Sequence, residues 1–201
     1  MGCLPRAALL LAAAMLVAAS PVNTNSTKET RLYVVDVGLG NAAFVVAPSG
    51  EVMLLDTGPA RAAQRVLAFM GQNGIRKIDY LVASHFEEDH IGAAAVIAGK
   101  VPIVRFVDHG QSVVYGKDDN WWKQRRGPWF REGMSKQYDQ SFDVYRAARD
   151  KARHIVVKAG DRVPIAALDV VVVSAAGRAA CRGCPCTDAD VSLHPKRCRF
   201  L

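Results

Sequence analysis

His85-Phe86-Glu87-Glu88-Asp89-His90 is a stretch of six residues that carries five ionisable side chains. It directly follows the apolar run Ile78 to Ser84, whose length and polar boundaries indicate a buried strand. Unpaired charges at the end of such a strand carry a large desolvation cost, so they need a compensating partner. A metal ion is the simplest compensator, because imidazole and carboxylate groups are ligands of zinc, iron and manganese.

The spacing within this stretch suits one ion or two. His85 and Glu87 are two residues apart, so an extended backbone points both side chains the same way. Asp89 and His90 are adjacent and can diverge where a helix begins. Two ions held a few ångström apart can clamp a substrate and generate hydroxide at neutral pH. The alternative is a solvated charged loop that caps the next helix, and the pattern after a buried strand favours the metal site.

The surrounding chain alternates strands and helices. Apolar runs and turn residues predict three strands in a meander, then a helix, a strand, a second helix and a further strand, over 31–37, 42–47, 51–55, 60–73, 78–84, 91–98 and 102–107. This order is typical of an α/β (α+β) fold with crossover connections. In such sheets ligands bind at the carboxyl ends of the strands, where His109 also lies and could reach the same cleft.

Residues 111–150 differ in composition and are interpreted as an insertion over one edge of the sheet. They contain all three tryptophans, Trp121, Trp122 and Trp129, and a helix is predicted over 136–151. Mixed aromatic and cationic residues also occur in proteins that bind single-stranded nucleic acid, but an aromatic lid over the cleft is favoured. Short strands are predicted after the insertion, over 154–158, 162–165 and 168–174.

Several motifs in register resemble the metallo-β-lactamase superfamily. The stretch His85 to His90 resembles the HxHxDH signature of that family, with Glu87 at the second histidine position. Val35-Asp36-Val37-Gly38-Leu39-Gly40-Asn41 resembles its DVGxGD-type turn, and Leu54-Leu55-Asp56-Thr57-Gly58 resembles its LIDTG turn. Within the family, the segment Phe106 to Gly110 and the aromatic insertion resemble an exported branch related to the hydrolase domain of competence proteins.

The resemblance implies a four-layer αββα sandwich with a hydrolytic site for one or two zinc ions. His85 would be a ligand of the first ion, and Asp89 and His90 ligands of the second, with Asp89 also catalytic. Asp56 would support the site by orienting a ligand. We expect a metal-dependent hydrolase that uses a metal-activated hydroxide on an ester, amide or phosphodiester substrate.

Two departures from the family pattern qualify this expectation. Glu87 can still ligate, but its carboxylate shifts the preference toward iron or manganese or weakens zinc. Nothing after Val173 resembles the second half of the sandwich, which carries further ligands in the family. The chain is therefore expected to hold only the N-terminal half plus the insertion. The alternative function is a catalytically inactive or truncated relative that acts as a binding protein.

The two ends of the chain differ from the domain expected over 31–176. Residues 1–19 combine a basic start, an apolar core and a small-residue cleavage site, which predict a signal peptide and an exported, periplasmic or secreted protein. Residues 20–30 form a polar linker. Residues 177–201 are an irregular Cys-rich tail, for which a truncated or frame-shifted gene end is favoured over a zinc site or disulfides.

The net charge of the chain does not indicate a particular class of partner. The formal net charge is +7, but part of it lies in the signal peptide and the tail. The remaining excess does not demand a nucleic-acid or membrane partner, and neither is expected once the signal peptide is cleaved. The substrate is expected to be a small molecule or a polymer.

Overall fold

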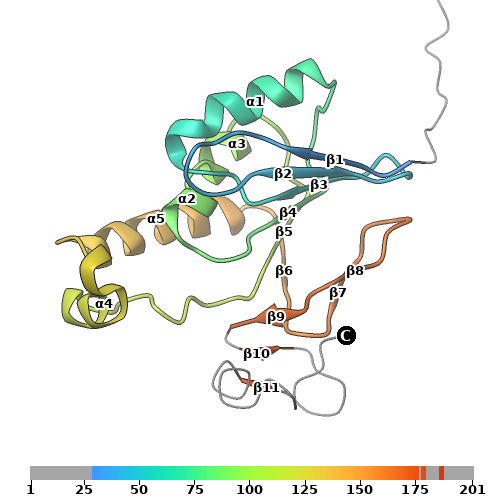
Figure 1. The fold of residues 1–201 in the computed structure, drawn as a ribbon. Coiled ribbons are helices and arrows are strands. Elements are labelled where there is room, and N and C mark those ends of the chain that lie inside the picture. Colours follow the sequence, from blue (N-terminus) through green and yellow to red (C-terminus); the bar gives the residue numbers. More distant parts are fainter. Residues whose placement is uncertain (1–28, 177, 180–185, 188–201) are drawn as a thin grey trace, which may run out of the picture.

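The computed structural model describes residues 29–176, 178–179 and 186–187 (Figure 1). Its centre is a six-stranded sheet in the order β1-β2-β3-β4-β5-β6. The first three strands form the predicted antiparallel meander, and β3 to β6 run parallel to one another. The strands are β1 (Arg31–Val34), β2 (Ala43–Val46), β3 (Val52–Leu55), β4 (Tyr80–Val82), β5 (Arg105–Asp108) and β6 (Arg153–Val156).

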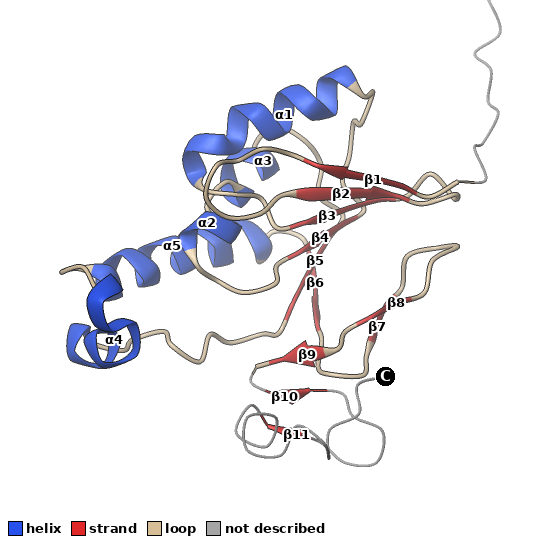
Figure 2. Ribbon diagram, in the orientation of Figure 1, coloured by secondary structure: helices blue, strands red, loops and turns tan. Residues whose placement is uncertain are grey.

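Helices cover one face of this sheet, and small sheets lie on the other (Figure 2). The helices are η1 (Ala60–Ala62), α1 (Ala63–Gln72), α2 (Glu88–Ile91), α3 (Ala94–Ala98), α4 (Asp119–Arg126), η2 (Gly127–Trp129) and α5 (Met134–Arg149). The small sheets contain β7 (Arg162–Val163) with β8 (Val170–Val171), and β9 (Ser174–Ala175), β10 (Arg178–Ala179) and β11 (Cys186–Thr187). The predicted mixed α/β class is confirmed, and the described residues form a helical layer, a main sheet and short strands opposite it.

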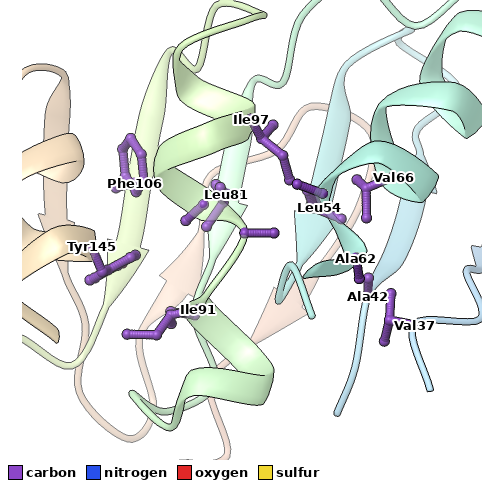
Figure 3. Packing of buried hydrophobic residues seen from close by; sticks show 14 of the residues in the cluster. Val37, Ala42, Leu54, Ala62, Val66, Leu81, Ile91, Ile97, Phe106 and Tyr145 are labelled. Carbon is purple, nitrogen blue, oxygen red and sulfur yellow. The ribbon is translucent and has the colours of Figure 1, made fainter. Parts of the chain in front are cut away.

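Two apolar clusters hold the layers together. On the helical side, Leu54, Leu81 and Phe106 of the sheet pack against Val66 and Ile97 of the helices (Figure 3). On the opposite side, a smaller cluster joins the main sheet to β7 and the turn after it, and consists of Ala47, Met53, Tyr80, Val107, Val157, Val163 and Ile165. The sheet is therefore buried on both faces along its parallel strands, as an α/β sheet requires.

The single helix predicted over 91–98 is wrong, because the structure divides this region in two. Helix α2 already begins at Glu88, where Glu88 and Asp89 place negative charge in the first turn. The break follows at Gly92 and Ala93. The backbone N–H of Ala93 donates to the carbonyl of Gly58, 3.1 Å away, and this contact ties the region to the turn after β3.

Helix α5 is part of the helical layer, at the end of the sheet where β5 and β6 lie. It forms the crossover between the parallel strands β5 and β6 and packs against α2 and α3. Its side chains Phe142 and Tyr145 are buried in the core. The segment 111–150 thus supplies the crossover helix at this edge of the sheet, and the aromatic face of the helix closes the core over β5. Helix α4 and η2, which come before α5, project beyond that layer (Figure 1).

The ends of the chain lie largely outside the described residues. This holds for the predicted signal peptide 1–19, for nearly all of the linker 20–30, and for most of the tail 177–201. Within the described part, no helix has the length and apolar character needed to cross a membrane.

Asp108 ties the crossover helix to the sheet through a buried polar cluster. Its carboxylate accepts hydrogen bonds from the Tyr145 hydroxyl at 2.7 Å and from the Gly110 backbone N–H at 2.7 Å. Arg149 Nη1 lies 3.4 Å from the same carboxylate, and His154 Nε2 lies 2.8 Å from it. Burial, followed by the Asp108 carboxylate, raises the pKa of Tyr145 well above its usual value, so the hydroxyl keeps its proton.

Replacing Asp108 by Ala should destabilise the fold by about 3–5 kcal/mol, because the substitution leaves buried partners unpaired. Urea unfolding followed by circular dichroism measures the change. Asp169→Ala is the matched control, because Asp169 forms an exposed pair with Arg162 and its loss should leave the unfolding midpoint unchanged. Equal destabilisation by both variants would contradict the role given to the cluster.

Gly40 brings the turn after β1 into contact with α2. A Cβ at this position would lie 1.8 Å from the Asp89 carbonyl oxygen, and the backbone has a φ of +96°. The neighbouring N–H of Asn41 donates to the same oxygen at 3.3 Å. A glycine is therefore required where two segments approach closely.

Gly40→Ala should be more destabilising than Gly50→Ala by about 1–3 kcal/mol, the usual range for overpacking. Gly50 also has a positive φ, +85°, but nothing lies within 4 Å of its added Cβ. The loss of stability in Gly50→Ala therefore measures the cost of the positive φ without a steric clash. Thermal unfolding of both variants checks the difference. Equal losses of stability in the two variants would mean that Asp89 leaves room for a Cβ at position 40.

Candidate metal centre

Two neighbouring parallel strands bring the site together. Asp56 follows β3, and Ser84 and His85 follow β4, so all three lie at the carboxyl ends of paired strands. Helix α2 then turns Asp89 and His90 back toward the same edge. The turn after β3 is fastened to this helix, because the Thr57 backbone N–H and hydroxyl both donate to the His90 carbonyl, at 2.7 and 3.0 Å.

Asp56 is the organising side chain of the site. It is 2% exposed and has a φ of 56°, a left-handed conformation that aspartate tolerates better than most residues. The Ser84 backbone N–H donates to Oδ1 at 2.7 Å, and the Ser84 hydroxyl donates to Oδ2 at 2.7 Å. Asn41 Nδ2 also donates to Oδ2, at 3.2 Å. The carboxylate is thus compensated without a cationic side chain of Lys or Arg among its described partners.

Asp56 also orients His90. His90 Nδ1 lies 2.8 Å from Asp56 Oδ2, and because a carboxylate accepts, this nitrogen carries the hydrogen. The other ring nitrogen, Nε2, is then available as a ligand and lies 3.8 Å from Asp89 Oδ2. A carboxylate that holds the far side of a ligating imidazole is the usual arrangement at metal sites.

His85 lies against His90, with their ring centroids 3.9 Å apart. Burial, followed by the nearby His90, lowers the pKa of His85. The neutral imidazole is therefore favoured, and this is the form that binds metal ions. Its Nδ1 lies 3.1 Å from the Ser84 hydroxyl.

Glu87 and His109 have different surroundings. The Glu87 carboxylate accepts a hydrogen bond from Arg126 Nη2 at the end of α4, and the two side chains form an ion pair. The His109 ring packs on Phe86 at a centroid distance of 4.4 Å, and burial lowers its pKa. His109 shares one cavity with His85, so the end of β5 does reach the edge of the site.

Two cavities adjoin these residues. The larger, about 480 Å³, borders Glu87 and Asp89 and has apolar walls that include Leu39, Trp129 and Met134. The smaller, about 280 Å³, borders His85 and His109. The two linings have four residues in common, which form the wall between the cavities: Glu87, Trp122, Arg126 and Tyr138.

The ligand chemistry fits a metal ion in part. Across the residues that the structure describes, no group of three or more His, Cys, Asp or Glu side chains is placed to hold a metal ion together. His90 Nε2 and Asp89 Oδ2 do face each other, and the neutral ring of His85 lies beside them. The imidazole and carboxylate groups of these three residues have the chemistry of metal ligands, although they do not converge on one point in this structure. Glu87 differs from them, because its carboxylate is paired with Arg126.

Three residues of the site were not predicted as site residues from the sequence. Ser84 and Asn41 support Asp56, and both stand within or beside the turn and strand motifs, so their positions were available as a signal. Arg126 pairs with Glu87 from 39 residues away and lies in a stretch without apolar periodicity. The mixed aromatic and cationic stretch that contains Arg126 was interpreted as a lid, which did not single out this arginine.

Comparison with known proteins finds relatives of this chain among competence proteins. It is 34% identical to competence protein ComA of Neisseria gonorrhoeae over 103 residues, which cover 51% of this chain and 14% of that protein. It is 30% identical to ComE operon protein 3 of Bacillus subtilis (strain 168) over 99 residues, 40% of this chain and 13% of that protein. The chain thus spans a small part of the length of these relatives.

Solved structures give weaker likenesses. A Thermotoga maritima protein described as a candidate metallo-beta-lactamase has a TM-score of 0.41 and 13% identity, and the match covers 67% of this chain and 61% of that one. A diphosphatase of the PhnP family has a TM-score of 0.38 and 18% identity, with 67% and 44% covered.

The model of the metallo-beta-lactamase superfamily matches residues 35–200, a range that includes both turn motifs and the stretch His85 to His90. Since this match spans well over half of the sequence, the chain belongs to the metallo-beta-lactamase superfamily.

Proposed function

We propose that the protein is a metal-dependent hydrolase that cleaves an ester, amide or phosphodiester bond. The observation that carries the proposal is the 2.8 Å contact between His90 Nδ1 and Asp56 Oδ2, which leaves Nε2 of His90 facing Asp89. Superfamily membership supports the same reaction class. The site also opens on two cavities that can admit a substrate.

His85, Asp89 and His90 would hold the metal, with zinc as the first candidate and iron or manganese as alternatives. When bound, such an ion supplies a Lewis acid and a nucleophile from water at neutral pH. Asp56 keeps the Nδ1 hydrogen of His90 in place and thereby orients its ring. Asp89 is the catalytic residue of the proposal, because it borders the larger cavity, where its carboxylate would be placed to accept a proton.

The proposal includes export to the periplasm or the medium, and the predicted signal peptide 1–19 supports it. A catalytically inactive binding protein is the second candidate, favoured by the Glu87–Arg126 pair, which occupies a side chain expected to ligate. Metal analysis and hydrolysis assays distinguish the two. Folded protein that neither binds a transition metal nor hydrolyses any test substrate would support the binding protein.

Asp89→Asn should lower hydrolysis by about 100-fold or more, the scale of a positioned acid or base. The assay uses p-nitrophenyl acetate and bis(p-nitrophenyl) phosphate, with bound metal measured by elemental analysis. Asp143→Asn is the control, because this carboxylate pairs with Arg146 on the exposed surface of α5 and should leave activity unchanged. Metal-free protein with activity that Asp89→Asn does not alter would refute the proposal.

Asp56→Asn should weaken metal affinity by about 10- to 100-fold, the usual loss when the partner of a ligating histidine is altered. Asparagine also tolerates a positive φ, so the turn is kept while the carboxylate that orients His90 is removed. Titration of metal-free protein followed by calorimetry measures the affinity. An unchanged dissociation constant in this variant would mean that Asp56 only stabilises the turn.

A further inference from the structure

The Glu87–Arg126 ion pair joins two segments that the chain brings together from a distance. Glu87 stands directly before α2, and Arg126 is the last residue of α4. Arg126 Nη2 donates to Glu87 Oε1, and each side chain is 34% exposed. The carboxylate at the second histidine position of the family signature therefore already has a cationic partner.

Helix α4 is anchored in a way that holds this cation in place. The Asp118 carboxylate caps the helix by accepting from the Trp121 backbone N–H at 2.9 Å. Asp119 accepts from the backbone N–H groups of Gly133 at 2.9 Å and Ser135 at 3.1 Å, which fastens α4 to the start of α5. The first turn of α4 is thus capped by Asp118 and is hydrogen-bonded through Asp119 to the start of α5.

Trp122 gives the guanidinium group a surface to lie on. The Arg126 guanidinium carbon is 5.3 Å from the centre of the Trp122 ring, within the range of a cation–π contact. Trp122 is 4% exposed, so its ring is itself fixed by the core. An arginine that is stacked and paired loses less freedom on forming its hydrogen bonds than a lysine would.

A metal ion and Arg126 compete for the same carboxylate. An ion on Glu87 would have to displace the guanidinium and would then face a positive charge at short range. Asp89 lacks this obstacle, because its ion-pair neighbour among the described residues is His90, at 3.8 Å. The charges therefore favour an ion on the side of His85, Asp89 and His90.

We propose that Arg126 serves as the cation at Glu87, so that Glu87 stays outside the ligand set of any divalent ion that the site binds. This inference rests on the proposed metal-dependent function. It goes further, because it removes Glu87 from the ligand set and gives Arg126 a defined role.

The test is a zinc titration of the full chain, in which the thiols of the Cys-rich tail are chemically blocked. Residues 4–180 contain no cysteine, so reduction and alkylation with iodoacetamide blocks the thiols without touching the site. Metal-free protein is titrated with Zn²⁺ in a calorimeter, and bound zinc is counted by elemental analysis after desalting. The wild-type chain should bind one equivalent.

Two variants locate the ion. The double variant Glu87→Gln with Arg126→Gln removes the pair without changing the net charge, and it should still bind one equivalent with an affinity within about threefold of wild type. Arg126→Ala should bind zinc about fivefold more tightly, because it removes a nearby positive charge and frees Glu87. Arg125→Ala is the matched control, since Arg125 stacks on Trp121 at 4.9 Å instead and should change the affinity less.

The outcomes separate this inference from the function on which it rests. Two equivalents in wild type, one of them lost in the double variant, would make Glu87 a ligand and overturn the inference while the metal site stands. An Arg126→Ala affinity no higher than that of Arg125→Ala would overturn the role of Arg126. Folded wild-type protein, verified by near-ultraviolet circular dichroism, that binds no zinc would remove the proposed function and the inference together.

Discussion

The buried carboxylate of Asp56 is the interaction on which the rest of the site depends. It joins the end of β3 to the end of β4 through the Ser84 backbone and hydroxyl, and it joins both to α2 through His90. A carboxylate 2% exposed would be costly if unpaired, and here each oxygen has at least one hydrogen-bond partner. The left-handed backbone of the turn aims the side chain inward, so the local conformation and the ligand geometry come from one residue.

Different partners divide the acidic residues of this region into separate roles. Glu87 is paired with Arg126, while Glu88 accepts from the Ala60 backbone N–H at 2.9 Å and fixes the start of η1. Asp89 remains beside His90 at the larger cavity. Three adjacent carboxylates thus serve a structural pair, a helix contact and a candidate ligand. Proximity in sequence alone does not distinguish them, because their partners come from different elements.

Much of the fold could be predicted because its signals are local. The apolar runs predicted each strand of the main sheet, and Gly40 and Asp56 stand in turns whose composition indicates a change of direction. The split at Gly92 could not be predicted, because it depends on a bond from Ala93 to Gly58. Helix α4 was missed for a related reason: its charged sequence has no apolar period, and contacts with α5 hold it. Within the site, the partner of Glu87 is the residue that only the folded chain reveals.

The link between Asp56 and His90 spans 34 residues, and it exists only when β3 and β4 lie side by side. His85, Asp89 and His90 therefore adopt their mutual arrangement in the native state and not in the unfolded chain. A ligand that binds only the native state lowers its free energy and shifts the unfolding equilibrium by mass action. Any ion that binds this edge of the sheet would thus stabilise the pairing of two strands and couple occupancy of the site to the free energy of unfolding.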